Sequence, residues 1–196
     1  MTSAHTLSVP RLETDRFLLR EYRRADFAPF AAHFAAHFAP SLAQDLAHDL
    51  AHDLAPAASA ADLAPPDSEA AWRIFCSHAG LWLLHGAGWW AVEEKQTGQL
   101  VGTVGAFFRE HSPVMELGWN TYSAFRGQGC AVEAASAALH YALEVRREPR
   151  VQALIAPGNA SSMRVAQRLG FMYEADTTLY GKALGCYTRE REGSVA

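Results

Sequence analysis

A glycine-containing turn between a strand-like segment and a helix-like segment constrains the fold of this chain more than any other feature. Residues 114–122 have the composition of a strand and residues 130–147 carry apolar side chains at helical spacing, with RGQGCA at 126–131 between them. Gly127 and Gly129 allow the positive φ angles that a tight turn needs. Because the first N–H groups of a helix have no partner within the helix, such a turn presents several of them to a ligand. The sequence therefore predicts an anion site at this turn.

Motif residues that are absent from the turn narrow the class of anion that it is expected to bind. The turn has neither the Gly-Lys-Ser/Thr of a Walker loop nor the G-x-G-x-x-G spacing of a dinucleotide-binding turn. A pyrophosphate group held by backbone amides from Gly127 to Ala131, without an obligatory lysine or magnesium ion, fits these residues best. A tight turn without a ligand is the alternative that this segment alone leaves open.

Strand and helix patterns are mixed along the rest of the chain. Alternating or apolar-rich runs predict strands at 11–22, twice within 89–108 around a turn at Thr97–Gly98, and at 114–122, 150–156, 171–181 and 183–191. Helical spacing and capping residues predict helices from Asp26, from Asp67 or Ser68, from the glycine turn to about Arg147, and from Asn159 to Leu169–Gly170. We expect an α/β (α+β) protein, with residues 1–196 forming one domain.

Residues 31–66 form an unusual insert in this pattern. The tetrapeptide repeats FAAHFAAHF and DLAHDLAHDLA are broken by Pro40 and ended by Pro56, and an Ala/Pro-rich linker follows. Because four residues turn a helix by roughly 400°, the leucines of the second repeat share one broad face, which predicts two short amphipathic helices. The pairs His33/His37 and His48/His52 have a spacing that can hold zinc, but duplication of a tetrapeptide produces the same spacing, so we expect no metal site.

Composition limits the partners and the compartment. A net charge of −4 argues against nucleic acid, because phosphate binding needs a basic surface. The three cysteines have neither metal-ligand nor redox spacing, which favours a reducing compartment over a disulfide framework. The chain opens with no basic-then-apolar leader and contains no apolar run of about 18 residues. We expect a cytoplasmic protein, monomeric or homodimeric, that binds neither nucleic acid nor membrane.

Four phrases in order along the chain resemble one family. They are LETDRFLLREYRRADF, WWAVEEKQTGQLVGTVG, ELGWNTYSAFRGQGCAVEAA and GNASSMRVAQRLGF. Together they resemble the GNAT superfamily of N-acetyltransferases, and within it the branch of ribosomal-protein N-terminal acetyltransferases. The resemblance covers most of residues 10–30 and 68–190. It implies a mixed, mostly antiparallel central sheet of about seven strands flanked by helices, with the fourth and fifth strands splayed apart.

The resemblance also implies acetyl-CoA as co-substrate and assigns residues to its binding. In the family, the turn after the fourth strand holds the pyrophosphate through backbone amides, and an asparagine and a serine after the fifth strand contact the pantetheine arm. The fourth strand, at 115–120, would lie beside pantetheine. The matching cofactor-binding residues here are Arg126, Gly127, Gln128, Gly129, Cys130, Ala131, Asn159 and Ser162.

Transfer of an acetyl group to an amine requires few catalytic groups from the protein. A neutral amine attacks the thioester directly, so a base or a water chain need only remove one proton. Glu116, on the fourth strand just before the turn, is the candidate base, and a structural or solvent-facing glutamate is the alternative. Relatives often place a tyrosine where this chain has Ala166, so Tyr122, Tyr141 or water would have to protonate the leaving thiolate.

These inferences converge on an acetyl-CoA-dependent N-acetyltransferase. A protein or peptide N-terminal α-amine is the preferred acceptor, and a small-molecule amine or an aminoglycoside is the alternative. A non-catalytic acyl-CoA-binding regulatory module is the alternative from another class. In the family, the first two helices help to form the acceptor site, and the insert at 31–66 departs from the family in this region. The identity of the acceptor is therefore the property that the resemblance specifies least.

Overall fold

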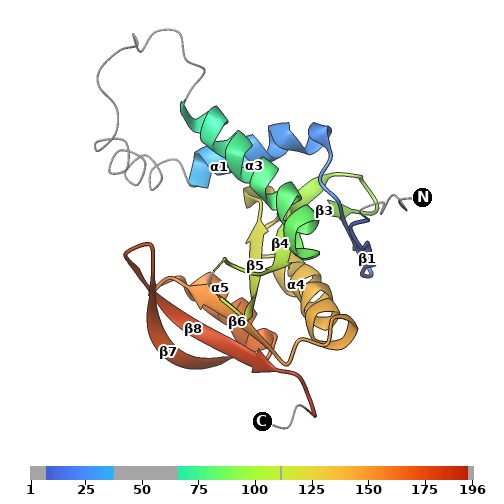
Figure 1. Cartoon of the computed structure of the whole chain (residues 1–196). Helices are drawn as coiled ribbons and strands as arrows, with labels where there is room; N and C mark the ends of the chain where they lie inside the picture. Colours follow the sequence, from blue (N-terminus) through green and yellow to red (C-terminus); the bar gives the residue numbers. More distant parts are fainter. Residues whose placement is uncertain (1–7, 38–65, 111, 194–196) are drawn as a thin grey trace, which may run out of the picture. The chain divides into compact units, whose positions relative to one another are not determined.

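The computed structural model describes residues 8–37, 66–110 and 112–193, and these form two compact units (Figure 1). One unit comprises Met1–Tyr22 with His78–Ala196, and the other comprises Arg23–Ser77. The predicted helix within 41–56, the linker that follows it, and the pair His48/His52 lie outside the described residues.

The larger unit is built on an eight-stranded sheet with the order β1-β2-β3-β4-β5-β6-β8-β7. Its strands are Leu12–Glu13 (β1), Phe17–Arg20 (β2), Gly88–Glu94 (β3), Leu100–Phe107 (β4), Met115–Thr121 (β5), Arg150–Ile155 (β6), Met172–Leu179 (β7) and Lys182–Glu190 (β8). Every neighbouring pair is antiparallel except β5 and β6, which run parallel. The helical elements of this unit include η2 (Ser123–Phe125), α4 (Cys130–His140), the π turn η3 (Tyr141–Val145) and α5 (Ala160–Arg168).

This architecture confirms the predicted fold class, a mixed, mostly antiparallel sheet flanked by helices. The sheet has eight strands because the segment expected to be one strand at 11–22 folds back on itself. The backbone N–H of Thr14 donates to the carbonyl of Phe17 at 2.9 Å, and Leu12 pairs with Leu19 across the resulting hairpin.

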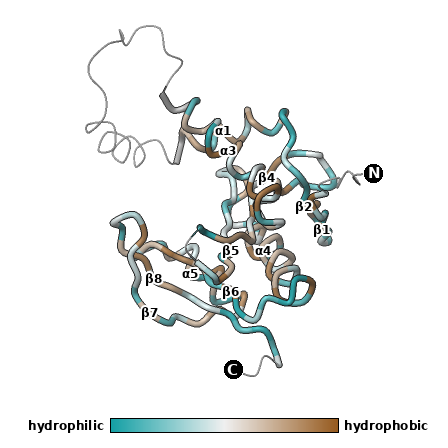
Figure 2. Tube along the Cα trace, viewed as in Figure 1, coloured by the Kyte–Doolittle hydropathy of each residue, from teal (hydrophilic) through white to brown (hydrophobic). Residues whose placement is uncertain are grey.

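The core of the larger unit lies where α4 packs on β4 and β5. Alanines at 134, 135 and 138 are almost completely buried, and they belong to the same hydrophobic cluster as Val104 and Leu117 of the sheet. Small side chains let the helix approach the sheet closely, which explains why an alanine-rich sequence forms a core helix rather than a surface one. Figure 2 shows hydrophobic residues along α4 and the central strands.

The indole of Trp89 covers part of the sheet at two glycines, which leave room for the ring. A Cβ atom at Gly105 would lie 2.5 Å from the indole, and one at Gly118 would lie 2.6 Å from it, so the ring lies directly on the backbone of β4 and β5. The imidazole of His78 stacks on the indole with 4.4 Å between ring centroids, and its Nδ1 lies 3.2 Å from the hydroxyl of Tyr22. The sheet, the indole and the imidazole thus form three layers.

The ends of α5 confirm two sequence predictions. The side chain of Asn159 accepts a hydrogen bond from the N–H of Ser162 at 3.1 Å, as a helix N-cap does. At the other end Gly170 has φ 76°, and the N–H groups of Gly170 and Phe171 donate to the carbonyls of Gln167 and Ala166. This is the Schellman arrangement, which requires a left-handed residue at C′.

The smaller unit contains η1 (Arg24–Asp26), α1 (Phe27–His37) and the first part of α3 (Pro66–His85). Asp26, expected as the N-cap, instead occupies the third position of η1: Arg23 is the N-cap, and the Asp26 carboxylate accepts from the N–H of Arg23 at 2.7 Å. Phe27 packs edge-on against Trp72 at 4.9 Å between centroids and against Phe75 at 5.5 Å. Aromatic contacts therefore join the two helices of this unit.

No metal-binding group of histidine, cysteine, aspartate or glutamate side chains is present within the described ranges. None of the helices described there is long and apolar enough to cross a membrane.

The glycines beneath Trp89 give a stability test. Gly105→Ala should destabilise the protein by about 1–3 kcal/mol, because the new methyl group must displace the indole from a packed surface. Gly80→Ala is the matched control: no atom lies within 4 Å of its Cβ position. Because Gly80 lies inside α3, alanine there should be neutral or slightly stabilising. Urea denaturation of both variants measures the difference, and equal effects would contradict the layered packing.

His78 gives a pH-dependent test of the same layers. Burial lowers the pKa of His78 from 6.5 to about 3. The unfolded chain therefore binds a proton between pH 6.5 and 3 that the folded chain does not, so stability is full above pH 6.5 and falls as the pH decreases through this window. At pH 5 the loss should reach about 2 kcal/mol at most. His78→Gln keeps a hydrogen-bonding side chain but removes the titration, so its stability relative to wild type should rise between pH 7 and pH 5 in denaturant titrations.

Candidate active site

The parallel strands β5 and β6 pair over only two residues each. Met115 pairs with Val151 and Glu116 pairs with Gln152, whereas β5 pairs with β4 from Glu116 to Thr121. Beyond Glu116 the two strands have no ladder between them, so the sheet opens at their carboxyl ends. This is the splay that the sequence led us to expect between the fourth and fifth strands.

The glycine turn follows β5 at the open end of the sheet. Gly127 and Gly129 have φ 77° and 78°, as predicted, and Gly129 is the N-cap of α4 without a side-chain cap. Among the described residues, the backbone N–H groups of 127–132 donate no well-formed hydrogen bond to another backbone group, and the first that does is Glu133, to the carbonyl of Gly129 at 3.1 Å. Six consecutive amides at a helix N-terminus therefore remain for an anion.

The side chains of the turn point back onto the protein. Arg126 donates from Nε to the carbonyl of Thr121 at 3.2 Å, and Gln128 donates from Nε2 to the carbonyl of Ala124 at 3.1 Å. These two bonds fix the turn against η2 and the end of β5. The turn thus contributes its backbone to the open end of the sheet.

Asn159 and Ser162 lie at the start of α5, directly after β6. Because β5 and β6 are adjacent parallel strands, the glycine turn and the start of α5 lie at the same edge of the sheet. The carbonyl oxygen of the Asn159 side chain accepts from the N–H of Ser162 and from the hydroxyl of Ser161 at 2.8 Å. Its amide nitrogen donates no hydrogen bond within the described residues. The structure therefore brings together all the residues that sequence reasoning assigned to the cofactor.

Glu116 lies at the last paired position before β5 and β6 part. Its side chain is only 8% exposed, and its two carboxylate oxygens accept from Nε and Nη2 of Arg109 at 2.6 and 2.8 Å. Glu116, and to a smaller extent the hydroxyl of Tyr180, raise the pKa of the Arg109 guanidinium. Tyr180 is at the tip of the β7–β8 hairpin, so Arg109 lies between Glu116 and that hairpin. Sequence reasoning selected Glu116 but missed Arg109.

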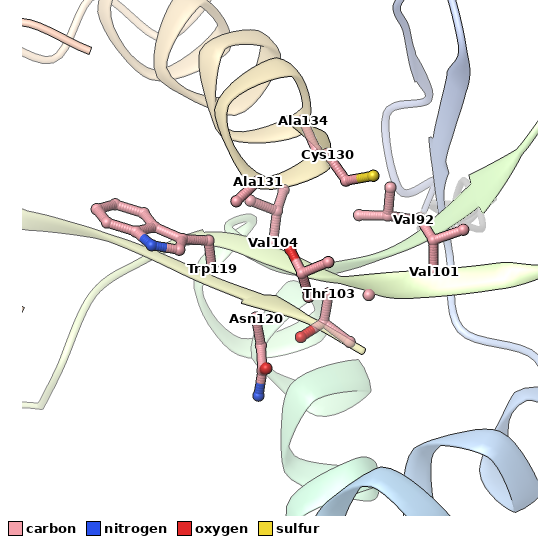
Figure 3. Close-up of a pocket in the computed structure, with 11 residues that line it drawn as sticks. Val92, Val101, Thr103, Val104, Trp119, Asn120, Cys130, Ala131 and Ala134 are labelled. Carbon is pink, nitrogen blue, oxygen red and sulfur yellow. The ribbon is translucent and has the colours of Figure 1, made fainter. Parts of the chain in front are cut away.

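A small pocket lies between the first turn of α4 and the central strands (Figure 3). Its lining is mostly apolar and includes Cys130 and Ala131 of the helix start and Trp119 of β5. Trp119 lies on the α4 side of the strand and Asn120 points away from the helix (Figure 3), as strand alternation requires. The two faces of β5 therefore carry different chemistry at the opening.

Comparison with known proteins identifies the family. Residues 16–172 match the family described as Acetyltransferase (GNAT) domain. A protein of Bacillus subtilis named uncharacterized protein YkkB is 35% identical over 108 residues, which are 54% of this chain and 63% of that protein. The match thus spans somewhat less than two thirds of that relative.

Solved structures show the same fold. An acetyltransferase from Agrobacterium tumefaciens superposes with a TM-score of 0.72 at 26% identity, covering 97% of this chain and 99% of that one. RimJ of Mycobacterium smegmatis, solved in complex with CoA-disulfide, superposes with a TM-score of 0.66 at 20% identity, covering 95% and 88% of the two chains. This chain belongs to the GNAT acetyltransferase domain family.

The residues at the opening fit coenzyme A. The amides at the start of α4 suit a pyrophosphate, and Asn159 begins α5 at the same edge of the sheet. Glycine at 129 is favoured by its left-handed φ of 78°.

Substitution at Gly129 tests this assignment. Gly129→Val should raise the Kd for acetyl-CoA at least roughly tenfold, because a β-branched side chain strains a positive-φ position and obstructs the amides. Gly98→Val is the control: Gly98 has φ 69° and open space around it, but lies in the β3–β4 turn. Both variants should be less stable than wild type, and calorimetric titration should show that only Gly129→Val binds acetyl-CoA more weakly. Unchanged affinity in Gly129→Val would place the pyrophosphate elsewhere.

Proposed function

We propose that this protein transfers the acetyl group of acetyl-CoA to a primary amine, and that its acceptor is the N-terminal α-amine of a protein or peptide. The observation that carries the proposal is the row of free amides at 127–132, placed where β5 and β6 part in a chain of the GNAT family. Acetyl-CoA supplies an acyl group already activated as a thioester. The protein need only hold it, admit the amine and accept one proton.

For the cofactor, we assign the pyrophosphate to the turn Arg126–Ala131 and the pantetheine arm to Asn159 and Ser162. Support comes from the positive end of the α4 dipole and from the shared edge at which the turn and α5 begin. Tyr141 packs on Trp90 at 5.4 Å between ring centroids within the core. Tyr122 belongs to a separate buried cluster with Ala91 and Leu100. Water is therefore the better candidate for protonating the leaving thiolate.

For the proton of the amine, Glu116 is the proposed acceptor, directly or through water. Its location at the start of the opening supports this role, because an amine that reaches the thioester must pass near the point where the strands part. Its ion pair with Arg109 supports the structural alternative, in which Glu116 holds Arg109 and the hairpin tip. The two roles predict a different pH dependence of kcat when Glu116 is replaced.

The preference for an α-amine rests on chemistry and on the resemblance of the sequence to ribosomal-protein acetyltransferases. With a pKa near 8, an α-amine is about a tenth neutral at pH 7, whereas a lysine near 10.4 is far less so. A weakly basic site therefore suffices for an α-amine. A small-molecule amine or an aminoglycoside is the second candidate acceptor, and a non-catalytic acyl-CoA-binding module is the alternative function.

We also propose that residues 1–196 act as one acetyltransferase domain in the cytoplasm, as a monomer or homodimer. The cysteines Cys76, Cys130 and Cys186 are all free thiols, which is compatible with a reducing compartment.

Two assays decide between these functions. Release of free CoA thiol in the presence of a panel of amines should occur with an enzyme and not with a binding module. A peptide library incubated with acetyl-CoA should gain the mass of one acetyl group at the N-terminus. Thiol release with aminoglycosides or polyamines but not with peptides would overturn the preferred acceptor.

Glu116→Gln tests the proton acceptor. Glutamine keeps the size of the side chain but cannot accept a proton at neutral pH, so kcat should fall by roughly 10²-fold or more. The defect should shrink as the pH rises toward the pKa of the amine, because the substrate then arrives neutral. The Kd for acetyl-CoA should change little, since the turn and Asn159 hold it.

Arg109→Gln is the matched control. It breaks the same ion pair but leaves the Glu116 carboxylate in place. If Glu116 only holds Arg109, both variants should lower stability and kcat alike, with no pH-dependent recovery. A recovery confined to Glu116→Gln would support the catalytic role, and a wild-type rate in that variant would exclude it.

A further inference from the structure

Arg16 links the β1–β2 hairpin to the start of α4. Its Nε and its backbone N–H donate to the two carboxylate oxygens of Glu133 at 2.7 and 2.9 Å, and its Nη1 donates to the carbonyl of Gln128 at 3.1 Å. The hydroxyl of Thr14 donates to the same carboxylate at 2.6 Å. These contacts join segments more than a hundred residues apart in the sequence.

The guanidinium of Arg16 also lies beside the free amides. Its Nη2 is 3.6 Å from the position that a Cβ atom at Gly129 would take. A guanidinium carries five N–H donors, and the contacts to Glu133 and Gln128 use two of them. The guanidinium lies over the ring of Phe17, 4.7 Å from its centroid, and its side chain is 43% exposed. Donors on both Nη atoms thus remain accessible next to the turn.

The positive charge of Arg16 balances a negative charge at the start of α4. Glu133 stands in the first turn of α4, where its carboxylate interacts well with the helix dipole but would repel a phosphate bound at the same amides. Burial alone would raise the pKa of Glu133, but the hydrogen bonds from Thr14 and Arg16 outweigh it, so the pKa is lowered and the group is ionised at neutral pH. The cation of Arg16 offsets this negative charge at the phosphate site.

We propose that Arg16 is a coenzyme-binding residue, which donates from its guanidinium to a phosphate of coenzyme A held at the amides of 127–132. This inference rests on the proposed placement of the pyrophosphate. Arg16 adds a second guanidinium beside the turn, whereas the Nε of Arg126 donates to the carbonyl of Thr121. Glu133 does not bind the ligand, and its negative charge lies near the proposed phosphate position. Removing Arg16 should therefore lower coenzyme affinity, whereas removing the Glu133 carboxylate should leave the affinity unchanged or raise it.

Calorimetric titration of CoA into wild type, Arg16→Gln and Glu133→Gln tests this pair. Arg16→Gln should raise the Kd for CoA roughly tenfold, in the range of a lost hydrogen bond to a charged group. Glu133→Gln should leave the Kd unchanged or lower it, because it removes a negative charge near the phosphate. Arg16→Lys, which keeps the charge but not the planar fork, should fall between wild type and Arg16→Gln.

Two further measurements separate the sources of the effect. Titration with 3′-dephospho-CoA distinguishes the phosphates: the same ratio between wild type and Arg16→Gln assigns Arg16 to the pyrophosphate, and a vanished ratio assigns it to the 3′-phosphate. Melting of the unliganded variants monitors folding, because both Gln substitutions break one ion pair and should destabilise the protein similarly.

The outcomes are distinct. A Kd for CoA in Arg16→Gln within twofold of wild type overturns the proposal and leaves the proposed acetyltransferase function intact. Equal weakening of CoA binding in Arg16→Gln and Glu133→Gln also overturns it, since only the structural ion pair would then matter. Absence of CoA binding in the wild type would overturn the proposed function as well.

Discussion

The separation of β5 from β6 is the constraint on which the rest of the site depends. Two parallel strands pair at Met115–Val151 and Glu116–Gln152 and then part, although each stays fully paired on its other side. The backbone groups that face the opening need partners, because unpaired polar groups are costly once buried. A ligand that enters the opening can supply those partners, and the elements after each strand then meet it from the same edge.

The start of α4 is held in place from both sides of the chain. Thr14 and Arg16, on the hairpin near the N-terminus, bind Glu133 in the first turn of the helix, while alanines of the helix pack on the sheet behind it. These contacts hold the amides of the turn in place at the helix start. A binding site preorganised in this way loses little entropy when a ligand orders it.

The sequence predicted those features that depend on neighbouring residues. The positive φ angles at Gly127 and Gly129, the Asn159 cap and the Gly170 terminus follow from local backbone chemistry, and each is present. The resemblance supplied the mixed, mostly antiparallel sheet and the splay between its fourth and fifth strands. The ion pairs Arg16–Glu133 and Arg109–Glu116 were missed, since no local pattern distinguishes an arginine that binds across the fold from one that is solvated. The hairpin at 11–22 was missed although four polar residues, 13–16, interrupt the apolar alternation, because only three residues reverse the chain and neither glycine nor proline marks the turn.

The two faces of β5 carry two different groups of side chains. On the α4 side, Leu117 belongs to the core and Trp119 packs on it, and the proposed coenzyme-binding residues Cys130 and Ala131 lie at the helix start. On the other face, Glu116 binds Arg109, and Gly118 lies beneath the indole of Trp89, which stacks on Phe107 at 5.1 Å between centroids. Arg109 in turn lies 5.5 Å from the Phe107 ring centroid, so one continuous row runs from Trp89 to the Glu116 carboxylate. Substitutions in this row would alter what reaches the opening without changing the amides of the turn. Because a side chain on one face of a strand can change without moving its neighbours on the other, coenzyme binding and acceptor choice can diverge independently in a chain of this architecture.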